Sequence, residues 1–164
     1  MATLLDLRGA GRVIKLDPEL GPRRQEFRLM YVLPELRQWI EDTLPTLGST
    51  WKIEQSPLEQ FDAWLDTYCS GEALTYQRHF YPLNHIKAGI WEMKTADLRV
   101  FGWFSAVDCF IGANAGVADQ IKRLNMYRPY CEEALRRRAQ LDLDEPKFIP
   151  GDNPHAVVTN FDFP

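Results

Sequence analysis

The stretch that decides the fold runs from Gly89 to Ile111 and reads Gly-Ile-Trp-Glu-Met-Lys-Thr-Ala-Asp-Leu-Arg-Val-Phe-Gly-Trp-Phe-Ser-Ala-Val-Asp-Cys-Phe-Ile. Its apolar residues come in short bursts rich in β-branched and aromatic side chains, and polar segments at 95–97 and 105–108 divide them. The pattern predicts three consecutive antiparallel strands, near 89–94, 98–104 and 107–112.

The middle predicted strand alternates with a period of two residues. One face carries Leu98, Val100, Gly102 and Phe104, and the other carries Arg99, Phe101 and Trp103. A half-open sheet with an arginine and two aromatic rings on one face could bind a flat, anionic ligand. The alternative interpretation is a sheet with helices on one side and a snorkelling Arg99 on the other.

Helical periodicity appears on both sides of this stretch. Apolar residues recur at helical spacing after Pro34, and Ser56-Pro57-Leu58-Glu59 forms a capping box that predicts a helix over 57–69. A final helix is expected from Pro129 to about Leu141. Short strands are expected at 12–16 and 26–32, although a helical interpretation of 26–32 stays open. The fold class is therefore α+β: a small antiparallel sheet of three to five strands packed against two N-terminal helices, with a C-terminal helix.

The composition, 45% hydrophobic and 26% charged over 164 residues, is typical of one domain with a real core. We expect a loosely attached extension at 1–25, the α+β domain at 26–141, and a proline-rich acidic tail at 142–164. The tail is expected to add one strand or to lie as a flap over the basic region.

Two segments beside the predicted sheet are expected to be irregular. Residues 76–87, with Pro82 and Asn84, predict a loop that brings together Arg78, His79, His85 and Lys87. Residues 112–116, Gly-Ala-Asn-Ala-Gly, predict a flexible hinge, because their spacing fits neither phosphate-binding glycine motif.

The cysteines and the length of the apolar runs limit which classes of protein the sequence fits. Cys69, Cys109 and Cys131 lack Cys-x-x-Cys spacing and are expected to be buried free thiols, with no metal or other cofactor. No apolar run is long enough for a signal peptide or a membrane span, so we expect a cytoplasmic protein without a membrane partner.

Charge is unevenly distributed along the chain, whose net charge is −4. Residues 76–138 hold 10 Lys/Arg against 6 Asp/Glu, a balance of +4, while the flanking segments 1–75 and 139–164 each have a balance of −4. The predicted sheet and the helix after it thus form the basic part of the chain.

Cations and aromatic residues alternate in this basic part, which fits RNA backbone and unstacked bases. Such groups also support metal-free RNA cleavage, in which a 2′-hydroxyl attacks the adjacent phosphate while cations stabilise the developing charge. The candidate RNA-binding residues are Arg78, Lys87, Trp103, Lys122, Arg123, Tyr127 and Arg128. Arg99 and Lys94 are candidate electrostatic stabilisers, and Tyr130 and His85 are candidate proton-transfer residues.

The order of elements, with Gly-Ile-Trp-Glu-Met-Lys-x-x-Asp-Leu-Arg-Val-Phe-Gly-Trp-Phe and a last helix near Tyr-Cys-Glu-Glu-Ala-Leu-Arg-Arg, resembles the RelE/ParE toxin superfamily. The likeness is to its HigB-like, phage-associated branch and covers about 33–141. It implies a toxin of a toxin–antitoxin system, ribosome-dependent cleavage of mRNA as an endoribonuclease (mRNA interferase), and neutralisation by a cognate antitoxin.

The resemblance also assigns roles by position. Arg99 falls where such toxins keep a phosphate-stabilising arginine, Lys94 at a usually basic position of the same hairpin, and Tyr130 where some members have a functional tyrosine. The run of Lys/Arg usual after the third strand is replaced by Gly112–Gly116. The alternative function is a non-catalytic RelE-like module of a phage or mobile element that binds and inhibits another protein.

Each candidate also has a structural interpretation. Arg99 is typical of a surface ion pair, His85 of a loop histidine satisfied by hydrogen bonds, and Tyr130 of a packing residue. Residues 136–138, three arginines, are typical of a solvated helix face that pairs with Glu132 and Glu133.

Overall fold

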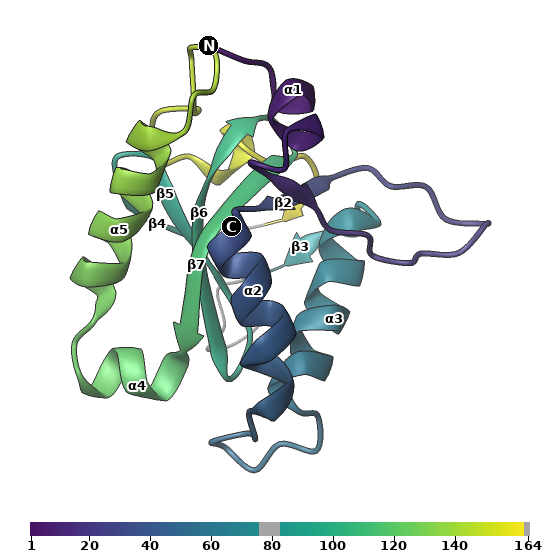
Figure 1. The fold of residues 1–164 in the computed structure, drawn as a ribbon. Coiled ribbons are helices and arrows are strands. Elements are labelled where there is room, and N and C mark those ends of the chain that lie inside the picture. Colours follow the sequence, from purple (N-terminus) through teal and green to yellow (C-terminus); the bar gives the residue numbers. More distant parts are fainter. Residues whose placement is uncertain (76–82, 163–164) are drawn as a thin grey trace.

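The computed structural model describes residues 1–75 and 83–162, and Figure 1 shows how their elements are arranged. The helices are α1 (Leu4–Gly9), α2 (Pro34–Asp42), α3 (Pro57–Cys69), α4 (Ala118–Arg123) and α5 (Tyr127–Gln140), with 3-10 turns η1 (Leu44–Thr46) and η2 (Pro154–Ala156). The strands are β1 (Ile14–Lys15), β2 (Leu29–Val32), β3 (Leu74–Thr75), β4 (Leu83–Lys87), β5 (Ile90–Lys94), β6 (Leu98–Ala106), β7 (Cys109–Val117) and β8 (Phe161–Asp162).

The main sheet has six strands in the order β1-β2-β7-β6-β5-β4. All neighbours are antiparallel except β2 and β7, which run parallel from Leu29 opposite Cys109 to Val32 opposite Gly112. The prediction of a purely antiparallel sheet of three to five strands is therefore wrong in detail. Two short N-terminal strands join the sheet on one side, and β4 extends it on the other.

The sheet is covered on both faces, which confirms the α+β class and corrects its layout. Leu36 of α2 and Phe61 and Leu65 of α3 pack on one face. Ile121 of α4 and Ala134 of α5 pack on the other. In Figure 1, α5 and α2 flank the central strands, with α3 beyond α2. The fold thus has three layers, and the helices divide between both faces.

The helices α2 and α3 begin where the sequence places their start signals, whereas α5 begins at Tyr127, ahead of the predicted start at Pro129. At α3, the Ser56 side chain accepts from the Glu59 backbone and the Glu59 side chain accepts from the Ser56 backbone, so the predicted capping box is present. The α2 helix begins with Pro34 in its first turn and ends at Asp42. Both apolar stripes face the sheet, as predicted.

The β6 strand confirms the predicted alternation. Leu98, Val100 and Phe104 face α2 and α3, whereas Phe101 and Trp103 face α4 and α5. The predicted hinge at 112–116 is wrong, because these residues form the second half of β7. Their small size serves packing: a Cβ at Gly112 would lie 2.8 Å from Leu36 Cδ2.

Both chain ends pack against the domain. In the N-terminal segment, predicted to be loosely attached, Leu7 and Val13 are buried and β1 pairs with β2. In the tail, Val157, Val158 and Phe161 join the core on the α2/α3 face, and β8 pairs in parallel with β3. The predicted added strand is therefore present.

A fully buried arginine ties the tail to the rest of the fold. Arg28 is 0% exposed, and its Nη2 donates to the carbonyls of Glu72 (2.9 Å) and Thr159 (2.7 Å). Its Nη1 donates to the carbonyl of Tyr68 at 2.8 Å. These charge-assisted bonds join the segment just before β2, the end of α3 and the tail.

Two smaller predictions can be compared with the structure. Cys69, Cys109 and Cys131 are free and buried, as expected. No helix within residues 1–75 and 83–162 has the length and apolar character needed to cross a membrane.

Candidate functional site

The most distinctive polar feature lies on the sheet face that α4 and α5 cover. Lys94 of β5 lies opposite Arg99 of β6, and Arg99 lies opposite Gly116 of β7. In the next row, Glu92 lies opposite Phe101, and Phe101 opposite Asn114. Cross-strand partners have Cβ atoms about 5 Å apart, so these rows bring charged and amide groups together at one end of the sheet. We call Lys94, Arg99 and Lys122 the cationic cluster.

Arg99 lies beneath the surface of the cluster. The residue is 5% exposed, and its Nη1 donates to the carbonyl oxygens of Thr95 (2.7 Å) and Leu98 (2.8 Å). Its Nε is buried and has no hydrogen-bond partner among the described residues. The hairpin backbone therefore holds the guanidinium in place while part of its bonding capacity stays unused.

Lys94 shares the site with a buried carboxylate. Lys94 Nζ lies 3.1 Å from Glu92 Oε1, which also accepts from Asn84 Nδ2 at 3.2 Å. The Glu92 side chain is 2% exposed, and its Oε2 has no partner within the described part of the chain. A buried carboxylate needs a nearby cation, and here Lys94 supplies one.

Lys122 adds a third cation from α4. Its pKa is lowered by burial first and then by the positive charges of Arg99 and Lys94, while Glu92 and Asp119 act to raise it. Because Arg99 and Lys94 contribute to the lowering after burial, the charges of these two strand cations act on the Lys122 ammonium. Three cations from β5, β6 and α4 thus face a common region.

Tyr130 of α5 covers the same end of the sheet. Its ring stacks on Phe101 with centroids 5.3 Å apart, and Asn114 Nδ2 donates to its carbonyl at 3.0 Å. A Cβ at Gly116 would lie 2.5 Å from Tyr130 Oη, so the glycine makes room for the phenol next to Arg99. Burial raises the pKa of Tyr130, which keeps the hydroxyl protonated.

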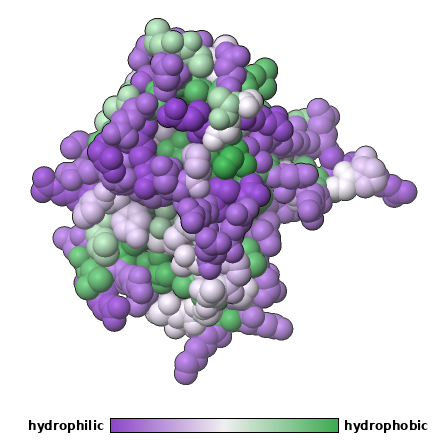
Figure 2. Space-filling view, viewed as in Figure 1, coloured by the Kyte–Doolittle hydropathy of each residue, from purple (hydrophilic) through white to green (hydrophobic). Residues whose placement is uncertain are grey.

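The structure overturns the expectation of an open aromatic face. Phe101 and Trp103 are both 0% exposed, because α5 packs over them with small residues such as Ala134. Trp103, a candidate RNA-binding residue, lies in the core and presents no ring face to a base. In the view of Figure 1, which shows α5, α2 and α3, the surface is mostly hydrophilic, and paler and apolar residues lie mainly in its lower half (Figure 2).

His85, a candidate proton-transfer residue, lies apart from the cationic cluster. Its ring packs edge-on against Trp91 at 5.1 Å, and Trp91 belongs to the core on the opposite face of the sheet. His85 Nε2 accepts from the Gly89 amide at 3.1 Å, and burial lowers the His85 pKa although Asp152 acts to raise it. His85 therefore cannot share a substrate phosphate with Arg99 in this arrangement.

The remaining candidates are spread over the surface. Arg128 pairs with Glu132 at 2.9 Å with its side chain 86% exposed, while Tyr127 lies edge-on to Phe101 at 6.2 Å. Lys87 and Arg123 are exposed, and Arg78 and His79 lie outside the described residues.

The triple-arginine segment is only partly a solvated face. Arg136 and Arg137 both pair with Glu133, as predicted. Arg138 is buried instead: it donates to the Ala88 carbonyl at 2.8 Å and lies 3.5 Å over the Phe148 ring. This third arginine therefore ties α5 to the β4–β5 turn and to the tail.

Sequence reasoning missed Glu92 and Asn114 as parts of the site. A signal for Glu92 was present, because residues two apart on a strand share a face, so Glu92 necessarily lies beside Lys94. Asn114 was hidden because its segment was interpreted as a hinge.

Within residues 1–75 and 83–162, no group of three or more His, Cys, Asp or Glu side chains could hold a metal ion. In comparisons with known proteins, no family model, no curated protein and no solved structure gave a significant match. The likeness to RelE-type toxins thus rests on the sequence motifs in residues 89–104 and 130–137 and on the predicted order of elements.

Proposed function

We propose that this protein is a RelE-like toxin, or a protein derived from one, that acts on RNA in the cytoplasm through the cationic cluster. The observation that carries the proposal is the grouping of Lys94, Arg99 and Lys122, from three elements, at the end of the sheet that Tyr130 covers. Several cations beside a hydroxyl donor suit a phosphodiester whose charge grows in the transition state.

The reaction that fits this set is metal-free transesterification of RNA. The 2′-oxygen attacks the adjacent phosphorus, the bond from phosphorus to the 5′-oxygen breaks, and a 2′,3′-cyclic phosphate and a 5′-hydroxyl result. A base takes the proton of the 2′-hydroxyl, and an acid gives a proton to the leaving 5′-oxygen. Arg99 and Lys94 stabilise the charge on the phosphoryl oxygens.

The pKa directions favour particular proton-transfer roles. The lowered pKa of Lys122 increases the share of its neutral amine, which suits the base. The raised pKa of Tyr130 keeps its phenol protonated, which suits the acid. Lys122 and Tyr130 therefore take the proton-transfer roles, and His85 takes neither, because it lies on the other face of the sheet.

Expression in a bacterial host tests the proposal. We expect growth arrest with cleavage of mRNA on ribosomes, and a fall of about 100-fold in cleavage rate for Lys122→Ala. Arg123→Ala is the matched control, because Arg123 is the exposed cation next along α4. The double variant Arg99→Ala with Lys94→Ala should also lose activity. Unchanged growth with the wild-type chain would overturn the catalytic proposal.

A second candidate, the non-catalytic binding module, is favoured by one specific observation. Lys94 is paired with Glu92, and Arg99 Nη1 is engaged by two backbone carbonyls, so both cations already have partners inside the protein. Under this proposal the chain inhibits another protein and cleaves no RNA. Co-purification of a specific host protein, unaffected by Lys122→Ala, would support it over the first.

A RelE-like toxin also requires a partner that neutralises it in the host cell. We propose a cognate antitoxin, whose presence would restore growth when both proteins are expressed together. A neighbouring gene for a small helix-turn-helix protein would be the simplest supporting observation.

A further inference from the structure

The chain between η1 and α3 presents an exposed tryptophan. In this segment, residues 48–55, which we call the Trp51 loop, Trp51 is 57% exposed. The other four of the five tryptophans are buried or packed against the core: Trp39, Trp64, Trp91 and Trp103. Trp51 is therefore the tryptophan that offers ring surface to a ligand.

Hydrogen bonds fix the Trp51 loop to the turn between β5 and β6. The Thr50 amide donates to Asp97 Oδ1 at 2.9 Å, and Asp97 is 1% exposed. Gln60 Nε2 donates to Asp97 Oδ2 at 2.6 Å and to the Gln55 carbonyl at 3.1 Å. The backbone beside Trp51 is thus held in place before a ligand arrives, which lowers the entropy cost of binding.

The same turn holds the cationic cluster on its other side. The Thr95 carbonyl accepts from Arg99 Nη1 at 2.7 Å, and the Asp97 carbonyl accepts from the Ala118 amide, at the start of α4, at 2.8 Å. Lys122, further along α4, is exposed. Figure 1 shows the chain between α2 and α3 and the α4 helix at the same, lower end of the molecule. The turn therefore joins the Trp51 loop to the cationic cluster.

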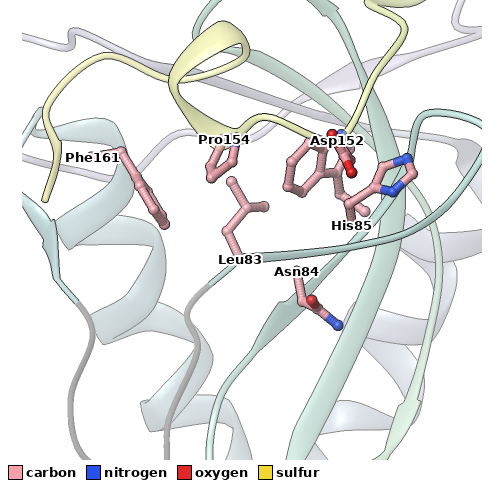
Figure 3. A pocket seen from close by; sticks show the side chains of 7 residues that line it. Leu83, Asn84, His85, Asp152, Pro154 and Phe161 are labelled. Atoms are coloured by element: carbon pink, nitrogen blue, oxygen red, sulfur yellow. The ribbon is translucent and has the colours of Figure 1, made fainter. Parts of the chain in front are cut away.

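Two other aromatic sites are closed to a base. Trp103 is 0% exposed beneath α5. The cavity of about 260 Å³ beneath the tail is lined in part by Trp91 and Phe161, and Figure 3 shows Phe161 across this cavity from His85. Trp91 is 1% exposed and Phe161 is 6% exposed, so neither presents a ring face. An aromatic contact with RNA thus fits the Trp51 loop better than either of these sites.

We propose that Trp51 stacks on an unpaired base of a single-stranded RNA whose neighbouring phosphate lies at the cationic cluster. This inference rests on the proposed function, because it requires the cluster to bind RNA phosphate. Every base has a flat face, so the contact adds affinity without selecting a sequence. The adjoining cations favour RNA over a protein partner, because they complement a polyanion.

Fluorescence anisotropy of a labelled oligouridylate tests the contact on the full chain, and methylated 2′-oxygens protect this probe from cleavage. Trp51→Ala should weaken binding by about tenfold, because one base loses its stacking partner. Trp51→Phe should keep most of the affinity, since a phenyl ring also stacks. Trp51→Leu, which is apolar but has no ring, should lose as much as Trp51→Ala. Equal affinity of the phenylalanine and leucine variants would overturn the stacking role.

Phe27→Ala is the matched control, because it removes another exposed aromatic ring. Phe27 is 59% exposed, and its amide donates to the carbonyl of Cys69 at the end of α3. The Trp51 loop precedes the other end of this helix, which is about 20 Å long. The control variant should therefore bind the oligouridylate as the wild-type chain does.

Salt dependence separates the ring from the charges. Lys122→Ala should reduce the slope of log affinity against log salt concentration, because binding releases fewer counterions. Trp51→Ala should lower the affinity at every salt concentration and leave this slope unchanged. A slope that falls as much in Trp51→Ala as in Lys122→Ala would show that the loop only positions the cations, and would overturn the inference.

Failure of this inference is distinguishable from failure of the proposed function. RNA binding that Trp51→Ala leaves unchanged, or no binding of the oligouridylate by a wild-type chain that still arrests growth, would overturn the stacking role alone. Binding through Trp51 without cleavage of mRNA on ribosomes would overturn only the catalytic proposal. Loss of a co-purifying host protein in Trp51→Ala, with RNA affinity unchanged, would assign the loop to a protein partner instead.

Discussion

The two faces of the sheet are built from the same strands but carry different chemistry. On β5, Trp91 and Met93 enter the apolar core under α2 and α3, whereas Glu92 and Lys94 point toward α4 and α5. The second face is apolar at one end, around Phe101, Trp103 and Ile111, and charged at the other. The comparison suggests that the α2/α3 face serves stability, while the charged end of the other face keeps polar groups that stability alone does not require.

The largest effect should follow from a change on the apolar face. Phe104 is 0% exposed and packs against Phe110 at 5.0 Å and Trp91 at 6.1 Å. Phe104→Ala should lower the free energy of unfolding by about 3–5 kcal/mol, because it removes a buried ring and leaves a cavity. Urea unfolding measures this change. The control Val107→Ala, at a 51% exposed position, should stay within about 0.5 kcal/mol.

A change at the charged end should have a smaller effect on stability. Arg99→Ala removes two charge-assisted hydrogen bonds and leaves the carbonyls of Thr95 and Leu98 without that donor. The free energy of unfolding should fall by about 2–3 kcal/mol. A loss as large as that of Phe104→Ala, measured in the same urea series, would remove the distinction between the two faces.

The smallest effect should come from the glycine beneath Tyr130. A methyl group at position 116 would lie 2.5 Å from Tyr130 Oη, so Gly116→Ala should lower stability by about 1–2 kcal/mol and turn the phenol aside. The half-buried phenol can move, which limits the loss. Thermal unfolding gives the stability change, and tyrosine fluorescence reports the ring. Gly9→Ala, where nothing lies within 4 Å of the added methyl, is the matched control.

The local elements were predictable because their signals are local. The capping box and Pro57 fixed the start of α3, and the alternation in residues 98–104 correctly divided β6 between two faces. The burial of the cysteines also followed from their spacing and from the composition. In each case the deciding residues lie within a few positions of one another.

Which faces of the sheet are covered by helices could not be predicted from such local signals. An arginine between aromatic residues looks the same in a strand open to solvent and in a strand covered by a helix, so the sequence did not reveal that α5 buries Phe101 and Trp103. The small residues of 112–116 were interpreted as flexible, although they allow close approach of Leu36 and Tyr130 from opposite faces. Both errors arose where distant segments decide the environment.

The separation of the candidate residues has the same origin. His85 and Arg99 are close in sequence, but β4 points the imidazole toward Trp91 while β6 points the guanidinium toward α4. The interpretation of 76–87 as a loop concealed the strand that makes this difference. Strand parity, once β4 is known, places the two side chains on opposite faces.

The parallel pairing of β2 with β7 constrains the order of events during synthesis. Leu29 lies opposite Cys109, so β2 can pair with β1 early but cannot pair with β7 until residues 109–117 have left the ribosome. Until then α2 and α3 have no completed sheet to cover, and their apolar sides face the cellular milieu. A nascent chain that stops before Cys109 therefore lacks the strand that supplies Phe110 and Ala115 to the core beneath α2 and α3, and this core is completed only after β7 has been made.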